Sequence, residues 1–196
     1  MAEVRVLGIS GSLRRGSYNT ALLRAAAERL PAGAELVEFD RLREVPPYDA
    51  DLEAPGPDGE PGAPPAVRAL REAIRGADAV LVATPEFNHS LPGVLKNALD
   101  WASRPAGRSA LNGKPAAAIG ASTGMFGAVW AQAEARKVLA ALGGRVVDAE
   151  LPVPHAHEHW EDGRLRLTPE QAERLDEILG ALVGKVEELR REPVAS

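Results

Sequence analysis

The 196-residue chain contains no cysteine, which excludes disulfides, thiolate nucleophiles and cysteine-ligated metals or clusters. It has no apolar run long enough to span a bilayer, and its N-terminus lacks the charged and apolar regions of a signal peptide. It also has no cluster of Lys and Arg, and its formal net charge is −5, which argues against nucleic acid as the main partner. We therefore expect a cytoplasmic protein with neither a membrane nor a nucleic-acid partner.

The length suits one domain with a sizeable core, and we expect residues 1–196 to form that single domain. The apolar fraction of 45% and the charged fraction of 26% are ordinary for a globular protein. Residues 46–65 are rich in Pro, Gly, Asp and Glu and have no periodicity of their own. A domain linker would have this composition, but residues 1–45 are too few to form a domain. We therefore predict a long loop or flap.

Strand and helix patterns alternate along the chain. Short apolar runs bounded by turn residues predict strands at Val4–Ile9, Ala34–Phe39, Asp78–Thr84, Lys114–Ala121 and Arg145–Leu151. Apolar residues at helical spacing predict helices at Asn19–Leu30, Pro64–Gly76, Leu91–Ala102, Ala128–Leu142 and Thr168–Arg190. This alternation predicts an α/β fold in which a doubly wound, five-stranded parallel sheet carries helices on both faces.

Doubly wound sheets bind ligands beyond the carboxyl ends of their strands, where the strand order reverses. The loops at 10–19, 84–92 and 121–128 follow the first, third and fourth predicted strands. We therefore expect the functional residues in these three loops.

The first loop combines flexible glycines, hydroxyl residues and two arginines directly before a helix. Glycines let the backbone turn tightly, hydroxyls donate hydrogen bonds, and a helix N-terminus attracts anions. The loop lacks the Walker lysine and the glycine spacing of a dinucleotide site, so the pattern favours one mononucleotide phosphate, gripped by Arg14 or Arg15. The alternative is a surface loop whose arginines are merely solvated.

The second loop, 84–93, holds two prolines that fix its path and leaves backbone amides at 86–88 for recognition of a flat, heteroatom-edged ring. An ordinary strand–helix connection is the alternative. The third loop, 121–127, has small residues that would let a planar ligand approach the backbone, and Phe126 could cover a ring. The alternative there is a glycine turn with a core phenylalanine.

Three sequence motifs, one in each loop, are similar to those of a known family. They are Gly-Ser-Leu-Arg followed by Ser-x-Asn, then Pro-Glu-Phe-Asn-x-Ser-x-Pro-Gly-x-Leu-Lys-Asn-x-x-Asp-Trp, then Ser-Thr-Gly. Over about residues 3–150 the chain resembles the NADPH-dependent FMN reductases, a flavodoxin-like group that includes bacterial quinone, chromate and azo-dye reductases. The resemblance implies a sheet with strand order 2-1-3-4-5.

The resemblance also implies which residues bind FMN. Those of the first loop would hold the phosphate, those of the second would line the isoalloxazine largely through main-chain groups, and those of the third would bind its pyrimidine edge. They are Ser10, Ser12, Leu13, Arg14, Ser17, Tyr18, Asn19, Pro85, Glu86, Phe87, Asn88, Ser122, Thr123 and Gly124. Phe87 departs from the family, where tyrosine is frequent, so a role that needs the hydroxyl is in doubt.

As a family member, the chain would pass hydride from NADPH or NADH to the flavin N5 and electrons on to a quinone or similar small acceptor. No catalytic side chain is expected. The resemblance also implies a homodimer or homotetramer, with the helix at 91–101 as an interface element. The alternatives are a flavodoxin-type electron carrier that oxidises no nicotinamide, and a flavin-free binding domain on the same scaffold.

A metal site is not expected. His155, His157 and His159 alternate as zinc ligands on a strand would, but no acidic or cysteine partner is spaced to complete a site. The segment is either a solvated loop after the last strand or a flap near the flavin of a neighbouring subunit, and the sequence leaves its role open.

Overall fold

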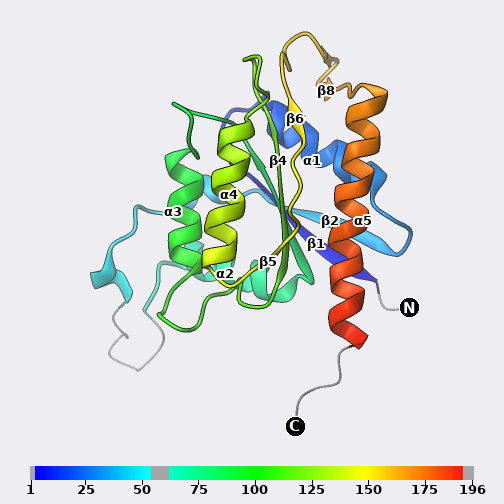
Figure 1. Cartoon of the computed structure of the whole chain (residues 1–196). Coiled ribbons are helices and arrows are strands. Elements are labelled where there is room, and N and C mark those ends of the chain that lie inside the picture. Colours follow the sequence, from blue (N-terminus) through cyan, green and yellow to red (C-terminus); the bar gives the residue numbers. More distant parts are fainter. Residues whose placement is uncertain (1–2, 54–61, 192–196) are drawn as a thin grey trace.

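A computed structural model describes residues 3–53 and 62–191 of the chain. Its main sheet is parallel and has the order β2-β1-β3-β4-β5, as predicted (Figure 1). The four long strands are β1 (Val4–Ser10), β2 (Ala34–Phe39), β3 (Ala79–Thr84) and β4 (Pro115–Ala121). Every residue of β3 and β4 is buried, because helices cover both faces of the sheet.

The five helices divide between two faces, and each face has its own core. α1 (Tyr18–Arg29) and α5 (Pro169–Arg191) pack on one face, and α2 (Pro65–Gly76), α3 (Gly93–Ala102) and α4 (Val129–Ala141) pack on the other (Figure 1). Neighbouring residues of β4 contribute to opposite cores, Ala118 to the α2–α3–α4 side and Ile119 to the α1–α5 side. All five predicted helices are present, and each predicted end lies within two residues of the observed one.

The predicted strand Arg145–Leu151 is wrong in its bounds. β5 (Arg145–Val146) and β6 (Pro152–Val153) are two short strands that pair with opposite ends of β4. Between them the backbone leaves the ladder, and the Leu151 N–H donates to the buried Gln132 side chain on α4 at 2.9 Å. The Gln132 side-chain amide thus accepts the hydrogen bond that a neighbouring strand would otherwise accept. The pattern of apolar residues in the sequence does not indicate such a contact.

A hairpin after the last sheet strand was not predicted. β7 (Trp160–Glu161) and β8 (Arg164–Leu165) pair antiparallel around Asp162 and Gly163, which both have positive φ. An Asp-Gly pair at such a turn is a known hairpin signal. The hairpin places residues beyond the main sheet against α1.

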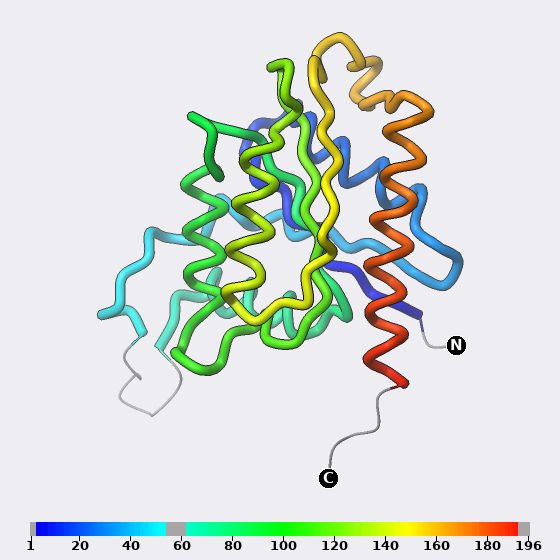
Figure 2. The backbone as a smooth tube through the Cα atoms, viewed as in Figure 1, coloured from blue at the N-terminus to red at the C-terminus, as the bar shows by residue number. Residues whose placement is uncertain are grey.

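The predicted loop at 46–65 has partial structure. η2 (Ala50–Glu53) is a 3-10 turn inside it, η1 (Leu42–Glu44) precedes it, and residues 54–61 lie outside the described part of the chain. Asn97 and Trp101 of α3 both donate to the Pro46 carbonyl at 2.8 Å. The start of the loop is therefore fixed on α3, along the course of the cyan tube in Figure 2.

Over residues 3–53 and 62–191, no helix has both the length and the apolar character needed to cross a membrane.

Candidate functional site

The three predicted loops meet at the carboxyl edge of the sheet, at the upper end of Figures 1 and 2. The Gly11 N–H donates to the Ala83 carbonyl at 2.8 Å, which joins the first loop to the end of β3. A Cβ at Gly11 would lie 3.0 Å from Leu95 Cδ2 and 3.2 Å from Pro85 Cδ. A larger residue at position 11 would therefore press on the second loop and on α3, and glycine lets the first loop approach both closely.

The first loop turns its polar groups around the start of α1. Ser17 caps the helix, because its hydroxyl accepts from the Thr20 N–H at 3.2 Å. The Thr20 hydroxyl donates to Ser10 Oγ at 2.9 Å, and the Ser12 N–H lies 3.4 Å from the same oxygen. The first-turn N–H groups of α1 have no partner inside the helix, so this end favours an anion.

Arg14 supplies the positive charge. Its guanidinium lies 4.5 Å from the centre of the Tyr18 ring, and Tyr18 meets Trp160 of the hairpin edge-on at 5.0 Å. Within the described residues Arg14 makes no ion pair, so its donors stay available to a ligand. Sequence reasoning missed Trp160, because nothing in the first loop indicates that a residue so far along the chain supports it.

Asn19 is buried, and its side chain is fully used by the protein. Its Nδ2 donates to the Ala121 carbonyl at 2.9 Å, and its Oδ1 accepts from the Ala121 N–H at 2.9 Å. This pair of bonds clamps the start of α1 to the end of β4. Asn19 thus positions the first and third loops relative to each other.

The second loop is tied to α4 by two carboxylates. Glu86 accepts from the N–H groups of Trp130 and Ala131 at 3.0 and 3.2 Å, and so caps a helix whose N-cap residue, Ala128, offers no side-chain acceptor. Glu134 accepts from Ser90 Oγ at 2.6 Å and from the Leu91 N–H at 3.0 Å. These hydrogen bonds lower the pKa of Glu134.

The tip of the second loop is a tight turn. Phe87 and Ser90 exchange backbone hydrogen bonds of 3.1 Å, while Asn88 and His89 between them have φ of 52° and 61°. Positive φ is uncommon for residues other than glycine, but asparagine and histidine adopt it more readily than most, so they suit this turn. The turn leaves the Phe87 ring 56% exposed.

The third loop presents small exposed residues and one exposed ring. Ser122 donates its N–H to the Val153 carbonyl at 3.1 Å, and the His155 N–H donates to the Gly124 carbonyl at 3.2 Å. Phe126 is 52% exposed and meets Trp130 at 4.7 Å, so the interpretation of Phe126 as a core residue is wrong.

The histidine segment forms no metal cluster. His157 Nε2 lies 3.7 Å from Glu158, and His155 and His157 are about half exposed. Over the described residues no group of three His, Asp or Glu side chains is placed to hold a metal ion.

The sequence matches the family described as NADPH-dependent FMN reductase over residues 4–158. The chain belongs to this family. The reductase is 43% identical over 173 residues to an NAD(P)H-dependent FMN reductase of Pseudomonas aeruginosa, covering 88% of this chain and 89% of the relative. It is 38% identical over 146 residues to a quinone reductase of Escherichia coli K12, covering 74% of each.

A solved structure agrees with this assignment. The flavoenzyme NAD(P)H:(acceptor) oxidoreductase FerB from Paracoccus denitrificans superposes with a TM-score of 0.78 at 34% identity, over 94% of this chain and 98% of that one. The reductase therefore has the flavodoxin-like fold, and its family makes it an oxidoreductase that uses FMN and NAD(P)H.

The residues present fit FMN. The first loop offers hydroxyls, helix N–H groups and the Arg14 guanidinium, which has no ion-pair partner among the described residues, and this donor set suits a phosphate monoester. The second and third loops offer exposed backbone beside an exposed aromatic ring, which suits a flat heterocycle with polar edges. The two kinds of surface lie at one edge of the sheet, as the two ends of a flavin mononucleotide require.

Proposed function

We propose that the chain passes electrons from NADPH or NADH, through FMN bound in the three loops, to quinones or similar small acceptors. The observation that carries this proposal is the convergence of an anion cradle and a ring-binding surface at the carboxyl ends of β1, β3 and β4. The names of its relatives, an FMN reductase and a quinone reductase, support the same reaction.

The proposed binding residues divide by chemistry. Ser12, Ser17 and Arg14 hold the phosphate with hydroxyl, backbone and guanidinium donors. Ser10, Leu13 and Tyr18 shape the loop around it. Asn19 acts through its clamp on Ala121 rather than by contact with the phosphate.

The remaining residues surround the ring. Pro85, Phe87 and Asn88 line one side, with Phe87 offering a flat apolar face in place of the tyrosine frequent in the family. Thr123 and Gly124 present backbone groups to the polar edge of the ring, and Ser122, whose backbone groups bond to Val153 and Ala156, offers its hydroxyl. Glu86 holds the second loop on α4 through its carboxylate and offers its own backbone to the ligand.

FMN, when bound, supplies the capacity to accept hydride and release electrons. The residues of the chain bind FMN and orient it toward the nicotinamide donor and the acceptor. The backbone N–H groups of Glu86, Asn88 and Gly124 would stabilise negative charge that develops on the ring, because they are fixed before the reaction, whereas the Phe87 N–H already donates to the Ser90 carbonyl. No side chain is needed as a general base. Loops left open at the surface admit a flat acceptor after the nicotinamide leaves.

We also propose that the protein is a homodimer or homotetramer. The predicted interface helix, α3, directs Leu95, Leu99 and Trp101 into the core, so only its outer face is free for contact. The exposed large apolar residues next to it are better candidates. They are Phe87, Met125, Phe126 and Trp130, all in or beside the second and third loops, and Val94 at the exposed start of α3 adds to them.

The test is direct. Purified protein should be yellow, or turn yellow on addition of FMN, and the FMN-loaded protein should consume NADPH when a quinone is present. A colourless protein that ignores FMN would contradict the flavin site. Tight FMN binding without nicotinamide oxidation would favour the electron-carrier alternative.

A further inference from the structure

We propose that Trp160 is a positioning residue for the flavin phosphate. By holding the Tyr18 ring against Arg14, it strengthens the preference of the site for FMN over riboflavin, the same flavin without its phosphate. The inference rests on the proposed function, in which Arg14 binds the FMN phosphate. Trp160 begins β7 of the hairpin, on a segment far along the chain from the first loop.

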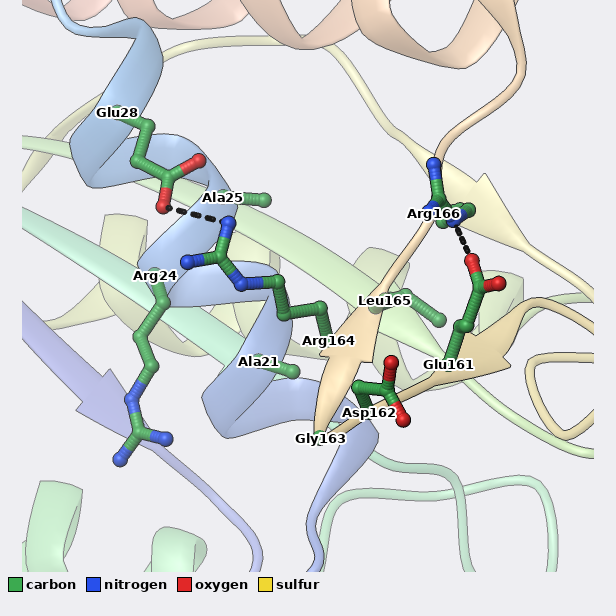
Figure 3. A pocket seen from close by; sticks show the side chains of 10 residues that line it. All are labelled: Ala21, Arg24, Ala25, Glu28, Glu161, Asp162, Gly163, Arg164, Leu165 and Arg166. Carbon is green, nitrogen blue, oxygen red and sulfur yellow. Dashed lines mark hydrogen bonds and ion pairs between the residues drawn. The ribbon is translucent and has the colours of Figure 1, made fainter.

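The β7–β8 hairpin lies against α1, as Figure 3 shows. Leu165 of β8 is buried in the same core as Ala21 of α1. Trp160 is directly opposite Leu165 in the hairpin, and opposite residues of an antiparallel pair point to the same face. Trp160 is therefore on the side of the hairpin that meets α1.

The sequence of α1 brings Tyr18 to the same place. Tyr18 is the first residue of the helix, and Ala21 and Ala25 follow it at the spacing that places residues on one helix face. Both alanines line the space between α1 and the hairpin. Their small side chains leave room for the hairpin, and the Trp160 ring meets the Tyr18 ring edge-on, with 5.0 Å between the ring centres.

The Tyr18 ring in turn holds Arg14. The Arg14 guanidinium lies 4.5 Å from the centre of this ring, which is within the range of a cation–π interaction. A free arginine side chain has many rotamers, and ordering it when a ligand binds costs free energy. A guanidinium that already lies on a fixed ring loses less freedom when it binds a phosphate. Trp160 thus contributes to phosphate affinity through Tyr18, without contact with the ligand.

Arg14 lies where a phosphate would be bound. It lines a cavity of about 220 Å³ together with Ser10 and Ser12. Arg43 lines the same cavity, but its Nη2 donates to the Leu13 carbonyl at 2.5 Å, so it is held independently of the hairpin. The effect of Trp160 should therefore pass through Arg14 alone.

Two ion pairs also involve the hairpin, as the dashed lines in Figure 3 show. Arg164 pairs with Glu28 of α1 at 3.9 Å, and Arg166 pairs with Glu161. All four side chains are more than half exposed, and exposed ion pairs contribute little to stability. The apolar and ring contacts, rather than these ion pairs, therefore fix the hairpin on α1.

The test compares FMN with riboflavin in titrations of apoprotein, followed by flavin fluorescence. Trp160→Leu should raise the dissociation constant of FMN about fivefold. The constant for riboflavin should stay unchanged, because riboflavin has no phosphate for Arg14 to bind. Trp160→Phe keeps a ring beside Tyr18 and should retain most of the FMN affinity. A general loss of structure would instead weaken the binding of both flavins.

A double variant tests the dependence on Arg14. In protein that carries Arg14→Ala, Trp160→Leu should cause no further loss of FMN affinity, because the group that Trp160 positions is gone. Arg164→Gln is the matched control in the same hairpin. It removes the exposed ion pair with Glu28, leaves the ring contact in place, and should change neither dissociation constant.

Three results would overturn the inference while the proposed function stands. They are wild-type FMN affinity in Trp160→Leu, an equal loss of affinity for both flavins, and a full effect of Trp160→Leu in the Arg14→Ala protein. Failure of wild-type protein to bind FMN would instead contradict the proposed function, and the inference with it.

Discussion

At the scale of single residues, the polar groups of the three loops are of two kinds. Some can bind a ligand, and others already form hydrogen bonds within the fold. Arg14 and the backbone N–H groups of the exposed Thr123 and Gly124 belong to the first kind. Asn19 and the carboxylate of Glu86 belong to the second, since each accepts or donates hydrogen bonds within the fold. Substitution should therefore affect binding at the first kind of residue and stability at the second.

Arg14→Ala should weaken FMN binding by about tenfold, because a charge-assisted contact to the phosphate is lost. The dissociation constant, measured by titrating apoprotein with FMN, checks this. Arg164→Ala, in which an exposed arginine is removed elsewhere, serves as the control. An unchanged affinity in Arg14→Ala would move the phosphate contact to Arg15 or to the backbone.

Asn19→Ala should lower the free energy of unfolding by about 2–3 kcal/mol, because the buried N–H and carbonyl of Ala121 both lose their partner. Urea unfolding of the apoprotein measures the change. Asn19→Asp keeps an acceptor for the Ala121 N–H but sets a buried carboxylate oxygen against the Ala121 carbonyl, so its loss at neutral pH should be no smaller. A wild-type unfolding curve for Asn19→Ala would show that the clamp contributes nothing to stability.

At the scale of elements, the second loop depends on α4 for its position, and this dependence should respond to pH. The pKa of Glu134 is lowered below its ordinary value near 4.5 by hydrogen bonds from Ser90 and Leu91. A lowered pKa means that the carboxylate stabilises the folded state above that ordinary value, and that this contribution is lost as the pH falls through the folded-state pKa.

Glu134→Gln should therefore reduce stability at neutral pH and flatten its decline on acidification below about pH 4.5. Thermal unfolding across this pH range measures both effects. Glu173→Gln, which replaces an exposed carboxylate on α5, is the matched control. Parallel pH profiles for wild type and Glu134→Gln would contradict the coupling.

The elements also show what the sequence could and could not predict. Strong periodicity and continuous apolar runs predicted β1 to β4 and all five helices, because burial on both sheet faces leaves a local signature. The predicted bounds of the last strand were wrong because the course of the chain there depends on Gln132 of α4. Its side chain accepts a hydrogen bond from the Leu151 N–H, a contact between residues that are distant in the sequence. The Asp162–Gly163 hairpin did carry a signal, but its contact with Tyr18 through Trp160 is non-local.

In the candidate site, too, local patterns predicted some features and non-local contacts decided the others. Spacing and residue type predicted which loops gather at the sheet edge, since topology alone brings carboxyl ends together. They did not predict that the carboxylates of Glu86 and Glu134 would hold the second loop on α4, because both contacts join segments about 44 residues apart. The assignment of individual residues to FMN remains a prediction.

At the scale of the whole molecule, the exposed rings near the site connect binding to assembly. Trp130 meets both Phe126 and His89 edge-on, at 4.7 Å each, so three rings form one exposed cluster beside the proposed flavin site. Exposed apolar clusters of this kind mark interaction surfaces. A second copy that covers this cluster would also shield the ring of bound FMN from water.

The double variant Phe126→Ser, Trp130→Ser should therefore shift the protein toward monomer and raise the KM for the quinone, because both the contact surface and the wall of the site are lost. The backbone N–H of Trp130 still donates to Glu86, so the cap of α4 is retained. Sedimentation velocity gives the mass, and circular dichroism reports whether the fold is kept. The control is Leu52→Ser on η2, where the side chain is 44% exposed. This variant removes apolar surface at a position distant in the sequence from the cluster, so the mass measured by sedimentation should stay unchanged. A monomeric wild-type protein, or a variant with wild-type mass, would show that the cluster serves the ligand site alone.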